Sequence, residues 1–232
     1  MPSTRSLPQD LDVDVCIVGG GIAGMTSAYL LSKEGKRVCV LEDSEIGSGQ
    51  TGRTTAQLSH VLDRRFSDLE KVHGEVGARM IVTVHSAAMR KIEEIIQREG
   101  IDCDLETVDG YLFSGGKIES GFFQKELSAS IRAGLLEVQA IRRAPLPHFD
   151  TGPCLRYPGQ LQMHPLKYLS GMAKALVEDK HHPAQIFTHT HVVDVKSTSD
   201  TVTIKTRNGF QVNAKAAVMA THSPESHFAF LS

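Results

Sequence analysis

The chain has 232 residues, of which 41% are hydrophobic and 22% charged, and its formal net charge is −2. This composition is that of an ordinary globular protein, long enough for one large domain or two small ones. The near-neutral charge and the lack of any basic tract longer than Arg64-Arg65 or Arg142-Arg143 argue against nucleic acid or an acidic membrane as a partner.

The N-terminal residues 1–8 lack the apolar core of a secretion signal, and no apolar run approaches the ~18 residues of a membrane span. We therefore expect a cytoplasmic protein without a membrane partner. The four cysteines have no C-x-x-C spacing. The adjacent His181-His182 pair and the pair His189/His191, on one face of a strand, have no third and fourth ligand nearby. No metal site is predicted.

The first predicted unit is a strand over 13–18, a helix over 22–34 and a strand over 37–42. The turn between the first strand and the helix has the pattern G-x-G-x-x-G at Gly19, Gly21 and Gly24. In dinucleotide-binding proteins the first glycine makes the turn, the second lets the backbone approach the pyrophosphate, and the third lets helix pack on strand. The alternative is a glycine-rich turn without a ligand.

Glu42 ends the second strand, 18 residues after Gly24. A carboxylate at that point can accept hydrogen bonds from the ribose hydroxyls of an adenosine, and it disfavours a 2′-phosphate. NAD and FAD therefore remain as candidates, and NADP does not. The alternative for Glu42 is a solvated residue at a strand end.

The following segment is less regular. Residues 47–60 are rich in Gly, Ser and Thr, so they form a surface loop or wrap a polar ligand. We expect a helix over 75–99, a hairpin over 105–113 turning at Asp109-Gly110, and a helix over 119–132. Residues 144–153 are predicted to be irregular because of their Pro and Gly content.

The last part returns to an alternating pattern. A helix with Pro165 in its first turn is followed by a strand over 186–195 and a hairpin that turns at Asn208-Gly209. A short buried strand over 216–221 then ends in small residues, which suits close approach to a ligand at the carboxyl edge of a parallel sheet.

The glycine motif, Glu42, the stretch 49–56, the stretch 162–169 and the strand 217–221 together resemble the D-amino-acid-oxidase-like FAD-dependent oxidoreductases. The stretches 51–56 and 164–169 most resemble the members that carry a Rieske iron–sulfur domain after the flavin domain. The resemblance implies an α/β fold: a Rossmann-like FAD-binding domain of the glutathione-reductase type, at 1–85 and 161–232, with an inserted, incomplete α+β substrate lobe at 86–160. It implies cofactor-binding roles for Gly19, Gly21, Ile22, Ala23, Gly24, Glu42, Asp43, Arg53, Thr54, Thr55, Val192, Ala220 and Thr221.

Within that set, the glycine motif would line the pyrophosphate, Val192 would offer its backbone to the adenine, and Ala220 and Thr221 would close over the dinucleotide. His60 is the histidine that we expect near the flavin, as a polar neighbour or a covalent anchor; a surface or loop-capping histidine is the alternative. No catalytic base is assigned.

Two departures from the family bear on function. Family members continue past the strand 217–221 into the rest of the substrate lobe, whereas this chain stops at Ser232, so we expect a truncated chain. No Cys-x-His…Cys-x-x-His pattern is present, so these residues cannot build a Rieske cluster.

The resemblance implies an enzyme that transfers a hydride from a C–H of an amine or amino-acid-like substrate to flavin N5, with oxygen or another acceptor. Two alternatives stay open: a catalytically inactive FAD- or ADP-binding remnant, and an NAD-dependent dehydrogenase.

Overall fold

A computed structural model describes residues 1–61, 63–115 and 121–222. The chain divides into two compact units. The first unit comprises Met1–Thr55, Ile96–Cys103 and the chain from His164 onward, and the second comprises Ala56–Ile95 and Asp104–Met163. The first unit is therefore built from three separate stretches of sequence, with the second unit inserted between them.

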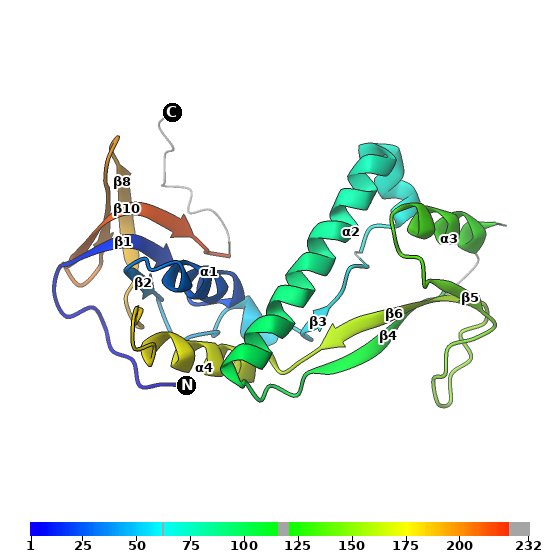
Figure 1. The fold of residues 1–232 in the computed structure, drawn as a ribbon, viewed down its shortest axis with the longest axis horizontal. Coiled ribbons are helices and arrows are strands. Elements are labelled where there is room, and N and C mark those ends of the chain that lie inside the picture. The colour runs from blue at the N-terminus through cyan, green and yellow to red at the C-terminus, as the bar shows by residue number, and fades with distance from the viewer. Residues whose placement is uncertain (62, 116–120, 223–232) are drawn as a thin grey trace. The chain divides into compact units, whose positions relative to one another are not determined.

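The first unit is built on a six-stranded sheet of order β7-β2-β1-β10-β9-β8. Neighbouring strands are parallel from β7 to β10, whereas β9 and β8 continue antiparallel (Figure 1). The strands are β1 (Leu11–Val18), β2 (Val38–Leu41), β7 (Gln185–Phe187), β8 (Val192–Ser197), β9 (Val202–Thr206) and β10 (Gln211–Met219). The strand order reverses at β1: the chain leaves β1 toward β2 on one side of it, whereas β10 pairs with β1 on the other side.

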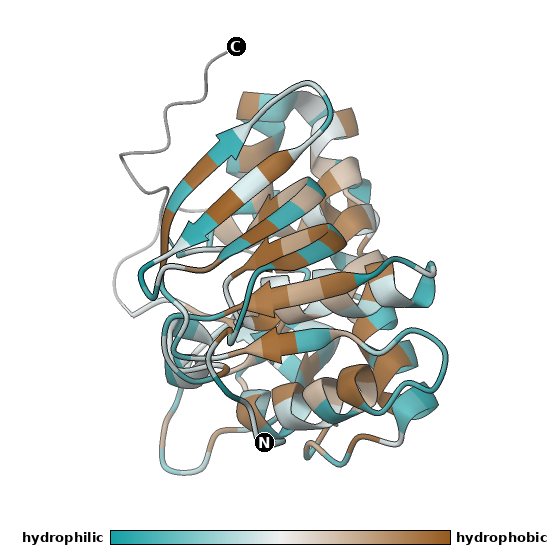
Figure 2. Cartoon of the chain, turned by 90° about the vertical axis from the view of Figure 1, so that its left-hand side faces the viewer, coloured by the Kyte–Doolittle hydropathy of each residue, from teal (hydrophilic) through white to brown (hydrophobic). Residues whose placement is uncertain are grey.

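Two helices, α1 (Ile22–Lys33) and α4 (Pro165–Val177), pack on each other and bury apolar faces beside the sheet. A strand that is covered on both faces has apolar residues throughout, as β2 does, whereas strands toward the edge alternate between apolar and polar residues. Figure 2 shows this change along the sheet, from strands that are hydrophobic over most of their length to strands with alternating hydropathy. The α/β fold with a largely parallel sheet predicted from the sequence is confirmed.

The second unit is a four-stranded antiparallel sheet with two helices. Strand β6 (Cys154–Gln162) pairs with β4 (Glu106–Leu112) along its length and with β3 (Gln57–Leu58) and β5 (Gln139–Ile141) at its two ends. Helices α2 (Phe66–Glu99) and α3 (Phe122–Arg132) supply most of the apolar residues that pack against β6.

Several sequence predictions are confirmed. The first strand, helix and second strand lie within a residue or two of the expected positions, residues 144–153 contain no helix or strand, and Asn208-Gly209 turns the hairpin between β9 and β10. Pro165 begins α4, and the His164 side chain caps that helix by accepting a hydrogen bond from Lys167 N–H.

The predicted hairpin over 105–113 is wrong. Residues 106–112 form the single strand β4, and Asp109-Gly110 falls at an irregularity in its pairing with β6. The Asp-Gly pair tolerates a bulge as well as a turn, and pairing with a distant strand decides between them.

Two further strands differ from their predictions, and one helix has an addition. The strand over 186–195 is two strands, β7 and β8, separated by residues 188–191. Residues 216–219 continue the longer strand β10, and 216–221 are partly exposed where a buried strand was expected. The predicted helix over 75–99 is confirmed: α2 breaks at Gly74, where φ is 70° and ψ is 172°, and its longer part runs from there to Glu99, while a helical segment from Phe66 to the break was not predicted.

The division into units also differs from the expected domains, because the second unit starts at Ala56, well before residue 86. The reason lies in α2, whose residues Ala78 and Val82 belong to the apolar core that α3 and β6 complete. Only the end of α2 belongs with the first unit.

Candidate functional site

A cleft of about 590 Å³ lies at the carboxyl ends of β1, β2 and β10. In open α/β sheets this edge, at the point where the strand order reverses, is where ligands bind. The cleft is lined by Val18, Gly19, Gly21, Ile22, Ala23, Leu41, Glu42, Asp43, Ser44, Ser48, Gly49, Gln50, Thr51, Thr190, His191, Val192, Ala220, Thr221 and His222. Nine of the predicted cofactor-binding residues are in this lining, and Gly24, Arg53, Thr54 and Thr55 are not.

Two glycines of the motif are required by the packing of the chain itself. Gly19 has φ +114°, and a Cβ there would lie 2.6 Å from Ala220 O. A Cβ at Gly24 would lie 1.9 Å from Gly19 O, so a side chain cannot enter without moving the backbone. Gly24 therefore lets α1 pack against the turn, which explains why it belongs to the motif without lining the cleft.

Gly21 differs from both. Its φ of −80° and ψ of −176° are extended backbone that any residue adopts. Among the residues that the structure describes, a Cβ at this position would meet one atom within 4 Å, Thr51 Oγ1 at 3.2 Å, and both residues line the cleft. The fold of the chain therefore does not explain a glycine at position 21, whereas a ligand lying against the main chain does.

Gly21 is also the N-cap residue of α1, and as a glycine it has no side chain that could accept hydrogen bonds from the first N–H groups of the helix. The first turn contains no acidic residue. Ile22 N–H donates to Thr51 Oγ1 at 3.1 Å, while the geometry of a helix leaves its first N–H groups without intrahelical acceptors. The positive end of the helix dipole thus faces a cleft lined by backbone, which suits a phosphate group.

Glu42 is held rigidly at the end of β2. Its Oε2 accepts a hydrogen bond from Gly20 N–H at 2.6 Å, and its Oε1 accepts one from Ser44 N–H at 3.0 Å. The carboxylate therefore joins the glycine turn to the start of the next loop. Each carboxylate oxygen can accept a second hydrogen bond, so this bracing is compatible with contact to ribose hydroxyls.

The segment between β7 and β8 forms the opposite wall. Thr190 N–H donates to Glu42 O at 2.9 Å, and the His191 ring lies with Nδ1 2.8 Å from Asp43 Oδ1. Next to them, His189 adopts φ +48°, a conformation that L-residues rarely adopt. These bonds hold residues 188–191 against the end of β2 and bring Val192 to the cleft.

The sequence prediction missed several lining residues, among them Thr51, Thr190 and His191. Thr51 lies in a short 3-10 helix, η1 (Gln50–Arg53), inside the glycine-rich stretch that was expected to wrap a polar ligand or form a surface loop. Arg53 ends this helix, Thr54 and Thr55 follow it, and all three residues are exposed. His60 lies in the second unit.

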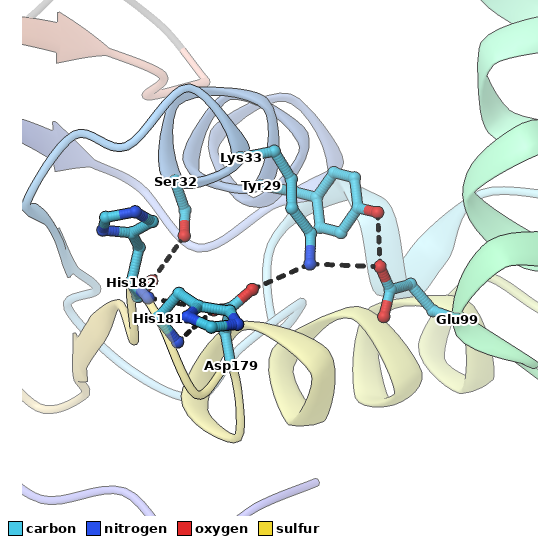
Figure 3. Close-up of polar contacts among 7 residues, drawn as sticks. All are labelled: Tyr29, Ser32, Lys33, Glu99, Asp179, His181 and His182. Carbon is cyan, nitrogen blue, oxygen red and sulfur yellow. Dashed lines mark hydrogen bonds and ion pairs between the residues drawn. The ribbon is translucent and has the colours of Figure 1, made fainter.

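A second cavity, of about 760 Å³, lies near the end of α1. Figure 3 shows its polar network, in which Lys33 Nζ lies 2.8 Å from Asp179 Oδ2 and 3.3 Å from Glu99 Oε1, and Tyr29 donates to Glu99. Asp179 also accepts hydrogen bonds from the backbone of His181 and His182. Hydrogen bonding to Lys33 and these N–H groups lowers the pKa of Asp179, and Asp179 in turn raises the pKa of Lys33. Lys33 lies between the two carboxylates of Asp179 and Glu99, so we interpret the network as a structural clamp on the end of α2.

Comparison with known proteins now decides the family. The family model "DAO: FAD dependent oxidoreductase" matches residues 14–227, nearly the whole chain. The chain belongs to this family. Its resemblance to D-amino-acid-oxidase-like proteins, seen in the sequence, is thereby confirmed, and FAD is the cofactor of the family.

Two curated relatives cover most of the chain. The protein YhfW of Bacillus subtilis, provisionally named a Rieske 2Fe-2S iron-sulfur protein, is 28% identical over 97% of this chain and 43% of its own length. The gamma-glutamylputrescine oxidoreductase of Escherichia coli is 32% identical over 93% of this chain and 50% of its own length. The chain thus spans about half the length of the curated relatives that it matches.

Among solved structures, glycine oxidase from Geobacillus kaustophilus matches 91% of this chain and 55% of its own, with a TM-score of 0.68 and 22% identity. This likeness supports the Rossmann-like FAD-binding fold. The residues of the cleft also fit FAD, because Gly21 leaves open the space that a side chain would fill and the helix end offers N–H groups to a diphosphate.

In residues 1–61, 63–115 and 121–222, no group of three or more His, Cys, Asp or Glu residues could hold a metal ion. Over the same residues, no helix combines the length and the apolar character needed to cross a bilayer. The four cysteines are free thiols and are buried.

Proposed function

We propose that the cleft at the end of β1, β2 and β10 binds FAD through its ADP portion, and that the chain is the cofactor-binding part of an amine or amino-acid oxidoreductase. The observation that carries this proposal is the glycine at position 21, which the protein's own packing does not require and which leaves main chain bare beside a helix N-terminus. Family membership supports FAD over NAD as the dinucleotide.

Each predicted residue has a role in this proposal. Gly21, Ile22 and Ala23 lie against the pyrophosphate and bind it through the N–H groups of Gly21 and Ala23, since Ile22 N–H already donates to Thr51 Oγ1. Gly19 and Gly24 allow the tight turn and the close packing of α1. Glu42 binds the adenosine ribose, and Asp43 lies beside it. The backbone of Val192 meets the adenine, Ala220 and Thr221 cover the dinucleotide, and Arg53, Thr54 and Thr55 border its flavin side.

When bound, FAD would supply a hydride acceptor, flavin N5, for a substrate C–H. The residues of this chain bind and orient the cofactor, and Glu42, braced by two backbone N–H groups, fixes the position of the ribose without rearranging. The names of the relatives, gamma-glutamylputrescine oxidoreductase and glycine oxidase, favour an amine or amino acid as the substrate. Oxygen is the electron acceptor that we propose, and the cytoplasmic location stays a prediction.

Binding of three nucleotides to the purified chain tests the proposal. We expect FAD to bind one-to-one with a visible flavin spectrum, ADP to compete with it, and FMN, which lacks the ADP portion, not to compete. Reduction of the bound flavin by an amine or amino acid without added reductant would extend the result from binding to catalysis. A chain that binds ADP and FAD but whose flavin no amine reduces is a binding remnant, and a chain that binds neither nucleotide refutes the proposed site.

A further inference from the structure

The second unit contains a polar cluster around His60 that the proposed FAD site does not use. His60 is half-buried and follows strand β3, while Gln160 lies on β6 and is 4% exposed. Gln160 Nε2 lies 2.9 Å from His60 Nε2 and 2.8 Å from Pro158 O, and Gln160 Oε1 lies 2.6 Å from Ser59 Oγ. All of these groups lie within the second unit.

The neighbours of Gln160 determine which way its amide faces. Pro158 O is a carbonyl and can only accept a hydrogen bond, so the atom 2.8 Å from it must be the amide nitrogen. The amide oxygen then faces Ser59 Oγ, whose hydroxyl can donate to it. The reverse orientation would place two acceptor oxygens against each other in a buried position, which is costly.

This orientation also determines the state of His60. An amide nitrogen is a donor only, so the ring nitrogen that faces it, His60 Nε2, must accept. A neutral imidazole has one acceptor nitrogen and one N–H, so the proton of His60 is on Nδ1. Protonation of Nε2 would bring two donors together and break this hydrogen bond.

The surroundings of His60 also favour its neutral form. Burial lowers the pKa of His60 below its ordinary value of 6.5, and the charge of the nearby His85 on α2 lowers this pKa further. The neutral form is therefore favoured near pH 7 both by burial and by the hydrogen bond from Gln160.

We propose that Gln160 is a positioning residue that holds His60 as a neutral imidazole with its proton on Nδ1. His60 then offers a ligand a hydrogen-bond donor, and its single lone pair is already engaged. Among the roles expected for this histidine, this arrangement excludes a covalent flavin anchor, while a polar neighbour and a loop-capping histidine are both compatible with it. The exclusion of a covalent flavin anchor rests on the proposed function, whereas the assignment of the tautomer does not.

Nitrogen-detected NMR of the full chain with ¹⁵N-labelled histidine tests the tautomer directly, without FAD. Comparison with His60→Gln assigns the resonances of His60. We expect a deprotonated, pyridine-type Nε2 and a protonated Nδ1 at pH 7. A protonated Nε2 in the wild-type chain would overturn the proposal.

Two variants on β6 separate the role of Gln160 from general effects on the strand. Gln160→Leu should release His60, so that the Nε2–H tautomer appears. Gln162→Leu, at a half-buried position whose side chain bonds Glu106, should leave the His60 pattern unchanged. An unchanged tautomer in a folded Gln160→Leu chain would overturn the role of Gln160.

Acid precipitation of the chain after incubation with FAD tests whether His60 anchors the flavin covalently. We expect all flavin to stay in the supernatant, and flavin retained on the precipitated chain through His60 would contradict the proposal. If the chain binds no FAD, the proposed function fails while the NMR result still decides the tautomer.

Discussion

Replacing Gly21 by alanine separates the needs of the fold from the needs of the ligand. The backbone at this position suits any residue, and the new Cβ would approach only Thr51 Oγ1, at 3.2 Å. Loss of the favourable N-cap glycine costs a few tenths of a kcal/mol or more, and the reduced freedom of the unfolded chain offsets about 0.4–1 kcal/mol of it. We therefore expect the unfolding free energy of Gly21→Ala to stay within about 0.5 kcal/mol of the wild type.

Binding should respond differently. The methyl group would stand where the diphosphate lies against the main chain, and losing one hydrogen bond to a charged group costs about 1.5–3 kcal/mol. The Kd for FAD should therefore rise roughly 10- to 150-fold, and Gly21→Val should abolish retention of the cofactor.

Two matched variants complete this experiment. Gly24→Ala places a Cβ 1.9 Å from Gly19 O and should lower the stability of the chain without FAD by at least about 1–3 kcal/mol. Gly115→Ala, at an exposed position where a Cβ would meet no atom of the described residues within 4 Å, should change neither property. Thermal unfolding without FAD and calorimetric titration with FAD provide the two readouts. Wild-type FAD affinity in Gly21→Ala would refute the reasoning.

Three further predictions concern other parts of the first unit. Glu42→Ala should weaken FAD binding by about 1.5–3 kcal/mol in titration calorimetry, with the chain still folded; a collapsed fold would instead make Glu42 a purely structural brace. The pKa of Asp179 is lowered from 3.8, so its ion pair with Lys33 stabilises the folded chain above that value and is lost as the pH falls through the lowered pKa. The difference in Tm between wild type and Asp179→Asn at pH 7 should therefore shrink below pH 3.8, and a difference independent of pH would argue against the clamp. Gly171→Ala would bring a Cβ within 2.5 Å of Ile101 Cγ2 and should lower the unfolding free energy by about 1–3 kcal/mol, which chemical denaturation measures; an unchanged midpoint would show that Ile101 yields freely.

The site could be predicted from the sequence where its residues are close in the chain. The turn from β1 to α1 and the acid after β2 form a local βαβ unit, so spacing alone places Gly19, Gly21 and Glu42 at one sheet edge. Thr190 and His191 reach the same cleft through hydrogen bonds between β7–β8 and the end of β2. No local pattern encodes these contacts, so they could not be predicted.

The second unit shows the same limit. The helical segment from Phe66 to Gly74 was not predicted, and its start is capped by Glu126 on α3, 1% exposed, which accepts hydrogen bonds from Phe66 N–H at 2.7 Å and Ser67 N–H at 3.0 Å. A cap supplied from a distant helix leaves no signature next to the helix start. In the same way, pairing of β4 with β6 keeps Asp109-Gly110 in a strand.

The central claim is that a diphosphate lies against the bare main chain where β1 passes into α1. A titration of ¹⁵N-labelled chain with ADP, followed by amide NMR, tests it most directly. The account predicts that the amide resonances of Gly21, Ile22 and Ala23 shift first and saturate together. Saturable binding of ADP that leaves these three amides unmoved would contradict it.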